Sequence, residues 1–173
     1  MTLAPPGGVQ VGDLLVAYVA YDNASGSLSG PPAGWTVLDS HTGSDLGSWI
    51  ASYVYQGEAN FTWNFTGAPT NGVIIRAYRN ASVGQHGPIS STTLNQISTN
   101  PITVGAGNWF LCFFGCYSTG AAVSSPPAGL SNAEVNANMA SYDSGGADAG
   151  SDTATLTWSQ NGGHAYGEGI EIV

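Results

Sequence analysis

Apolar residues along this chain recur at every second position or in short continuous runs, and the 3.6-residue period of an amphipathic helix is absent. Glycine occurs 25 times and proline nine times, which interrupts any long helix. The pattern predicts many short β-strands, with less than about a tenth of the residues in helices. The strands predicted in the first half are Leu14–Tyr21, Trp35–Ser40, Trp49–Tyr55, Asn60–Phe65 and Val73–Tyr78. Those predicted in the second half are Ile102–Val104, Trp109–Tyr117, Asn138–Tyr142, Thr153–Trp158 and Tyr166–Val173.

Two of these strands, Leu14–Tyr21 and Trp109–Tyr117, are apolar on both faces. Such strands are typical of a sheet centre buried on both sides, or of a sheet covered by a partner subunit. The other strands alternate more regularly, so we expect them to be half-exposed. Clusters of Gly, Asn, Asp and Ser predict turns at Asn23–Gly30 and Ser144–Asp152.

The chain also repeats itself at a separation of 95 residues. The matching segments are Gly12–Ala20 with Gly107–Gly115, Pro31–Trp35 with Pro126–Leu130, Phe61–Trp63 with Leu156–Trp158, and Gly72–Ile75 with Gly167–Ile170. One pair, Ile50–Tyr53 with Met139–Tyr142, is separated by 89 residues, which a shorter loop in the second half explains. Two copies are too few for a solenoid. We interpret them as related halves that each give one apolar face to a shared core.

A chain of 173 residues is long enough for one well-buried domain. We therefore predict a single all-β domain over residues 1–173, with half-repeats at about 1–80 and 101–173 and a crossover at about 81–100. The expected architecture is a β-sandwich of jelly-roll type with two pseudo-symmetric halves. Trp63 and Trp158 should then occupy matching environments.

Three sequence features resemble a family of duplicated β-sandwich modules: Gly12-Asp13, Pro-Ala-Gly-Trp-Thr at residues 32–36, and Ala-Tyr-Arg at residues 77–79. Such modules occur in structural proteins of tailed bacteriophages and in large bacterial surface proteins. The match extends from Val9 to Val173, with Leu130 in place of a second tryptophan. The resemblance implies a β-sandwich that serves as a capsid decoration protein, a head fibre or an adhesive module.

Charge is scarce and negative, because eleven acids face only two bases, Arg76 and Arg79, and the formal net charge is −9. Such a chain repels the phosphates of nucleic acid and of anionic membranes, so we expect neither as a partner. The first residues do not resemble a signal peptide, and no apolar run reaches the roughly 20 residues of a membrane span. We expect a virion protein made in the host cytoplasm, or alternatively an extracellular or cell-surface protein.

Cys112 and Cys116 lie four residues apart in one predicted strand. At about 3.3 Å per residue their positions are about 13 Å apart, too far for a disulfide between them. We interpret both as buried free thiols that fill the core. An intermolecular disulfide or a metal site is the alternative.

Trp49, Tyr53 and Tyr55 lie on one face of a predicted strand, with Ala51 between them. If this face is exposed, the rings form a platform for a sugar ring. If it faces inward, the rings pack against the opposite sheet, as aromatic residues commonly do in sandwich cores. The sequence leaves both alternatives open.

Asp143, Asp148 and Asp152 lie in a glycine-rich segment and are candidate ligands for Ca²⁺, which prefers carboxylate and carbonyl oxygens. A solvated acidic loop is the alternative, because the spacing does not follow the EF-hand formula. We expect no other cofactor. Since the chain has no nucleophile elbow, phosphate loop, HExxH motif or CxxC motif, we do not expect an enzyme.

The resemblance, together with the length of one domain and the absence of catalytic motifs, implies a non-enzymatic virion structural protein, namely a capsid decoration protein or head fibre that binds the capsid lattice. The expected partner is the major capsid protein or another virion protein, and a homo-oligomer is also open. The alternative is a carbohydrate-binding or adhesive module that contacts glycans on a host surface. Exposure of the aromatic residues would distinguish the two functions.

Overall fold

The computed structural model describes residues 1–67, 71–117, 120–136, 138–160 and 164–173. Over these residues the chain is all-β and antiparallel and contains no helix, so the predicted fold class is confirmed. The described part of the chain accordingly offers no helix that is long and apolar enough to cross a membrane. The chain divides into two compact units, Met1–Ser82 (unit 1) and Val83–Val173 (unit 2).

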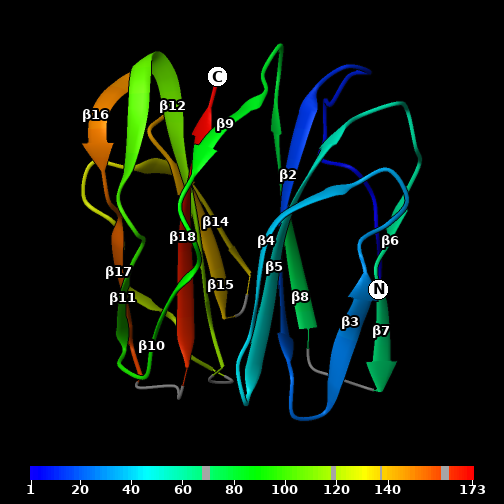
Figure 1. Cartoon of the computed structure of the whole chain (residues 1–173), viewed down its shortest axis with the longest axis vertical. Helices are drawn as coiled ribbons and strands as arrows, with labels where there is room; N and C mark the ends of the chain where they lie inside the picture. The colour runs from blue at the N-terminus through cyan, green and yellow to red at the C-terminus, as the bar shows by residue number, and fades with distance from the viewer. Residues whose placement is uncertain (68–70, 118–119, 137, 161–163) are drawn as a thin grey trace. The chain divides into compact units, whose positions relative to one another are not determined.

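Unit 1 is built around a sheet with the strand order β4-β5-β2-β8 (Figure 1). These strands are β4 (Thr36–Thr42), β5 (Leu46–Val54), β2 (Leu14–Asp22) and β8 (Asn71–Tyr78). Two smaller ladders complete the unit, β1 (Thr2–Leu3) with β6 (Phe61–Thr62) and β3 (Gly26–Gly30) with β7 (Asn64–Gly67). Antiparallel pairing bonds the main-chain groups of these short strands to one another.

The core of unit 1 lies on one face of the large sheet. Every second residue of β2 from Leu15 to Tyr21 points into it, as the two-residue period of a strand requires. The side chains that close the core from the smaller ladders and loops are Leu28, Trp35, Phe61 and Trp63. The remaining residues of β2 from Leu14 to Ala20 are also buried, which confirms that this strand is buried on both faces.

Unit 2 repeats this plan with additions. Its large sheet has the order β10-β18-β12-β15-β14, with β9 also paired to β18 and β16 to β12. The strands of this sheet are β9 (Val83–His86), β10 (Ser90–Thr92), β12 (Ile102–Cys116), β14 (Ser131–Asn136), β15 (Met139–Asp143), β16 (Asp148–Asp152) and β18 (Ala165–Ile172). The smaller sheet contains β11 (Gln96–Ser98), β17 (Thr155–Trp158) and β13 (Val123–Ser125).

The core of unit 2 is centred on one face of β12. Phe110, Cys112, Phe114 and Cys116 alternate along this face and contact residues of the smaller sheet. Both cysteines are buried and free, which fits their interpretation as small core residues. Their low reactivity stays a prediction.

The order β14-β15-β12-β18 in unit 2 repeats the order β4-β5-β2-β8 in unit 1, so the sequence repeat is a repeat of structure. The strand register corrects its alignment. Ala17 lies opposite Ile75 in unit 1, whereas Cys112 lies opposite Gly169 in unit 2. Ile75 therefore corresponds to Gly169 at a separation of 94 residues, not 95. An error of one residue matters, because it turns every side chain to the other face.

A second correction concerns β5 and β15. Ala17 lies opposite Ala51, and Cys112 lies opposite Tyr142. Ala51 thus corresponds to Tyr142, at a separation of 91 residues rather than 89. The sequence match of Ala51 with Ala140 keeps the correct face but is displaced by two residues along the strand.

Several segments predicted as connections form strands. Residues 81–100, predicted as a crossover, contain β9, β10 and β11 of unit 2. The predicted turns at Asn23–Gly30 and Ser144–Asp152 contain β3 and β16. These strands are short and polar, so their partners rather than their own composition define them. The jelly-roll arrangement and the single domain over 1–173 stay predictions.

Trp63 and Trp158 confirm that the two repeats place matching residues alike. Their exposed fractions are 0% and 1%. The main-chain N–H of Trp63 donates to Met1 O at 2.8 Å, and that of Trp158 donates to Asn95 O at 2.7 Å. The main chain of each tryptophan is therefore held beside a short strand that pairs in the smaller ladder of its unit, β1 in unit 1 and β11 in unit 2.

Gly47 in β5 is expected to tolerate no side chain. A methyl group at this position would overlap the ring of Tyr21, which is buried in the core and contacts Phe65 edge-on at 5.9 Å. We expect Gly47→Ala to lower the free energy of unfolding by about 1–3 kcal/mol, measured by urea denaturation. Gly7→Ala is the control, because no atom lies within 4 Å of its added methyl group. Equal stability of the two variants would contradict the clash.

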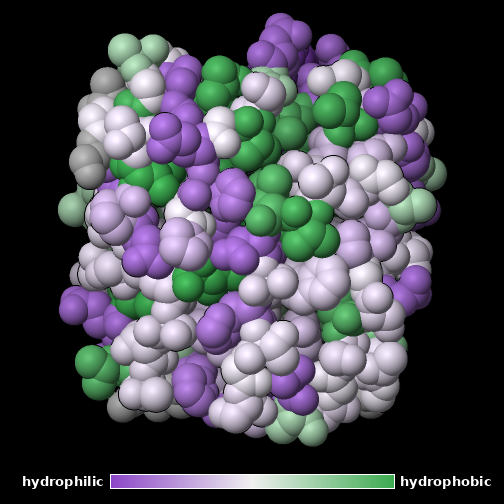
Figure 2. All heavy atoms as spheres, in the orientation of Figure 1, coloured by the Kyte–Doolittle hydropathy of each residue, from purple (hydrophilic) through white to green (hydrophobic). Residues whose placement is uncertain are grey.

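Charged residues are scarce in this protein, so uncharged polar residues supply most of its hydrophilic surface. Figure 2 shows hydrophobic groups interspersed with hydrophilic ones, and much of the face drawn has intermediate hydropathy. Charged residues make up only 8% of the sequence, so hydrogen-bonding groups must provide most of the hydration. Contacts with a partner would accordingly depend on hydrogen bonds and small apolar patches more than on ion pairs.

Candidate functional site

The predicted aromatic platform faces the core of unit 1. Trp49 and Tyr53 are partly buried and pack against the core cluster, and Tyr55 is buried within it. This is the inward arrangement that the sequence left as one alternative. Binding of a sugar by all three rings stays a prediction, for which the rings would have to expose a face.

Tyr53 is held by its neighbours on several sides. Its ring stacks on Trp35 at a centroid distance of 5.4 Å and meets Phe61 edge-on at 5.7 Å. Its hydroxyl donates to the Glu58 carboxylate at 2.5 Å. This hydrogen bond, together with burial, raises the pKa of Tyr53 to about 12, and it lowers the pKa of Glu58. Tyr53 therefore stays neutral at physiological pH and acts as a hydrogen-bond donor.

A shallow depression of about 300 Å³ lies beside Tyr53. Its other lining residues are Leu14, Gly34, Thr36, Ser52, Val54 and Gln56. Hydroxyl and amide groups beside an aromatic ring can bind the hydroxyl groups of a small polar ligand. Of the three predicted platform residues, only Tyr53 borders this depression.

The predicted calcium loop is arranged differently from the sequence hypothesis. Asp143 is buried at the end of β15, where its carboxylate accepts hydrogen bonds from the Asn132 amide at 2.7 Å and the Gly145 N–H at 2.9 Å. Asp148 and Asp152 are the first and last residues of β16 rather than members of a free loop. The described residues contain no group of three His, Cys, Asp or Glu side chains suited to a metal ion. The Asp148 side chain lies outside them, so calcium binding stays a prediction.

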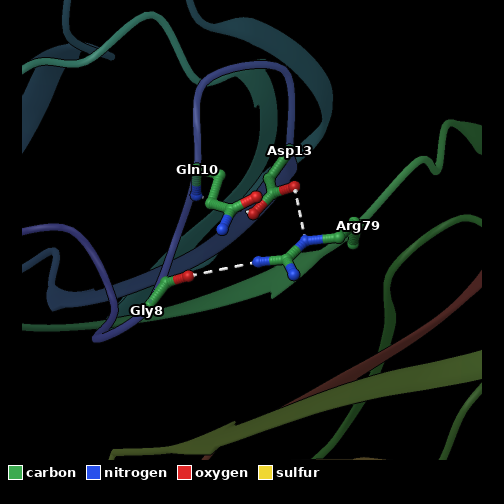
Figure 3. Close-up of polar contacts among 4 residues, drawn as sticks. All are labelled: Gly8, Gln10, Asp13 and Arg79. Atoms are coloured by element: carbon green, nitrogen blue, oxygen red, sulfur yellow. Dashed lines mark hydrogen bonds and ion pairs between the residues drawn. The ribbon is translucent and has the colours of Figure 1, made fainter.

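An ion pair between Asp13 and Arg79 joins two segments that flank the large sheet of unit 1. Asp13 directly precedes β2, and Arg79 directly follows β8 (Figure 3). Arg79 Nε lies 3.5 Å from Asp13 Oδ1, and Arg79 Nη2 donates to Gly8 O at 3.3 Å. The other Asp13 oxygen accepts from the Gln10 N–H at 2.8 Å. These contacts fasten the N-terminal loop to the end of the edge strand β8.

In unit 2, the carboxylate of Glu171 connects neighbouring segments of the large sheet. Asn108 stands at the repeat position of Asp13, and its amide donates to Glu171 Oε1 at 2.6 Å. Glu171 also accepts from the N–H groups of Gln85 at 2.9 Å and Gly105 at 2.7 Å. These bonds lower the pKa of Glu171. Sequence reasoning missed this cluster, because a single glutamate in a strand carries no motif.

The two large sheets differ most at one edge. In unit 2, β9 and β10 pair with the side of β18 that faces away from β12. In unit 1, β8 ends the sheet, and none of the described strands pairs with its corresponding side. A strand edge of this kind presents a row of main-chain donors and acceptors. The internal repeat was the signal that could have located this edge.

Comparison with protein-family models, with curated proteins and with solved structures gives no match for this chain.

Proposed function

We propose that this protein is a non-enzymatic virion structural protein, a capsid decoration protein or head fibre that binds the capsid lattice through a sheet edge and neighbouring loops. The proposal agrees with the resemblance carried by the Gly12-Asp13, Pro-Ala-Gly-Trp-Thr and Ala-Tyr-Arg sequences. Its expected partner is the major capsid protein or another virion protein.

The observation that supports it best is the edge of β8, a main-chain surface suited to another protein rather than to a small molecule. Three of the carboxylates fasten parts of the fold. Asp13 holds Arg79 and Gln10, Asp143 holds a turn, and Glu171 joins β9 to β12. These three carboxylates therefore have partners within the fold.

Purified protein should sediment with undecorated capsids. We expect saturable binding that changes little between low and high salt, because the contacts are mainly hydrogen bonds and apolar groups. If the net charge of −9 instead meets a basic patch on the capsid, salt will weaken the binding. Failure to sediment at any salt concentration, together with saturable binding to a glycan, would contradict the proposal.

The depression beside Tyr53 favours one second candidate, a carbohydrate-binding or adhesive module. Thr36, Ser52 and Gln56 supply hydroxyl and amide groups beside the ring. A glycan array screened with the wild-type protein and with Tyr53→Ala tests this alternative. Binding that the substitution abolishes in a folded variant would support it.

A further inference from the structure

We infer that the outer edge of β8 binds an extended, polar segment of a partner protein as an added antiparallel strand. The inference rests on the proposed function, because it names the surface that would contact the capsid. It follows from the comparison of β8 with β18, which occupy corresponding positions in the two repeats.

The register of unit 1 shows which main-chain groups of β8 point outward. Tyr55 N–H donates to Asp13 O at 2.9 Å, so Asp13 and every second residue after it in β2 bond toward β5. The intervening residues of β2 bond toward β8. In β8, the main-chain groups of Val73, Ile75 and Ala77 therefore point away from β2.

Corresponding groups in unit 2 are bonded to the added segment Val83–Thr92. Gly169 corresponds to Ile75, and its carbonyl accepts from the Gly87 N–H at 3.0 Å. Gly167 corresponds to Val73 and pairs with Ser90 of β10. Unit 2 thus shows added strands at the edge that corresponds to the outer edge of β8. Within the described residues, no hydrogen bond reaches Val73, Ile75 or Ala77 from this side.

The sequence of β9 and β10 indicates what kind of segment can add to the edge of β8. β9 and β10 span Val83–Thr92, and this segment is polar and short-stranded with glycine at two positions. At the edge of β8, the side chains of Val73 and Ile75 are already buried in the core, with 5% and 9% exposed. An added strand would therefore gain its affinity from main-chain hydrogen bonds rather than from a large apolar area.

A second copy of β8 is a poor occupant. The chain's only two bases, Arg76 and Arg79, lie in β8 or directly after it, and β8 contains no acid. Edge-to-edge pairing of two copies would bring Arg76 of one strand near Arg76 of the other, and like charges on paired strands are destabilising. In a folded second copy, β9 and β10 are already paired with their own β18. The occupant is thus a segment of another protein without basic residues.

Ala77→Pro tests the inference, because proline removes one outward N–H and is tolerated on a strand edge. Thr42→Pro is the matched control. The β4–β5 register places Thr42 among the outward-bonding residues at the opposite edge of the same sheet, and its side chain is exposed. We expect Ala77→Pro to weaken sedimentation with undecorated capsids by at least about tenfold. Thr42→Pro should bind like the wild type.

Hydrogen exchange provides a test that needs no substitution. In the free wild-type protein, the amides of Val73, Ile75 and Ala77 should exchange faster than that of Gly167, which pairs with Ser90 of β10. On capsids, they should become protected. This measurement decides the question if Ala77→Pro does not fold.

The outcomes separate the two proposals. If the wild type binds capsids but Ala77→Pro binds equally and the three amides stay unprotected, the edge is not the site, although the proposed function stands. If the wild type does not bind, both fail. If ultracentrifugation of the free protein shows a dimer that Ala77→Pro abolishes, the occupant is a second copy and the inference of another protein is wrong.

Discussion

Replacing Trp63 or Trp158 with alanine should lower the free energy of unfolding by about 3–5 kcal/mol, the range found when a large buried aromatic side chain is removed. Both indoles are almost fully buried, in the cores of units 1 and 2 respectively. Because they occupy matching places in the two repeats, we expect the two losses to be similar. Val135→Ala is the control, since Val135 is 51% exposed and should contribute little.

Urea denaturation followed by tryptophan fluorescence and calorimetry measures both losses and also tests the predicted single domain. A single transition that both substitutions shift to lower urea concentration would confirm one cooperative domain over residues 1–173. Two transitions, each shifted by only one substitution, would contradict it. A loss below about 1 kcal/mol for either variant would contradict the packing described for that core.

Removing the Glu171 carboxylate should cost about 3 kcal/mol, because its loss leaves the N–H groups of Gln85 and Gly105 and the Asn108 amide without their acceptor. Glu171→Ala tests this directly. Glu171→Gln keeps the volume of the side chain and one acceptor oxygen, so its loss should be smaller. Glu134→Gln is the control, because it makes the same change of charge on an exposed side chain.

Glu171 should also make the stability depend on pH. Its pKa in the folded protein is lower than that of an unfolded glutamate, about 4.3. The folded state therefore prefers the ionised carboxylate, and its contribution is present above that unfolded pKa. The contribution is lost as pH falls through the lower pKa of the folded state. Urea denaturation between pH 7 and pH 3 should show a smaller acid loss in Glu171→Gln than in the wild type, and equal losses would contradict this sign.

The longer strands could be predicted from the sequence. The strand Leu14–Tyr21 is apolar at nearly every position, and the structure has β2 at Leu14–Asp22. The strand Val73–Tyr78 lies within β8. Such runs are recognisable because burial on both faces leaves few polar positions. The repeat of strand order was foreseeable for the same reason, since it concerns these long strands.

The shorter strands and the site depended on information that the sequence does not display. β9, β10 and β16 contain mainly Gly, Ser, Gln and Asp, and they become strands because a neighbour binds their main chain. The strand register determines which residues surround the Glu171 carboxylate and which main-chain groups of β8 point outward. A one-residue error in the repeat alignment assigned Ile75 to the wrong face of β18, which hid its correspondence to Gly169.

The edge of β8 has a further consequence for preparing this protein. Proteins usually shield strand edges with lysine, proline or a covering segment, since bare edges seed aggregation and domain swapping. The Val-Ile-Ile sequence at residues 73–75 is the most apolar part of β8, and a segment that covers the matching edge begins only a few residues downstream, at Val83. In concentrated or partly unfolded samples, Val83–Thr92 of one molecule can pair either with its own β18 or with the β8 edge of a neighbouring molecule. Misassembly on storage should therefore begin at this strand, and low protein concentration during refolding is the simplest protection.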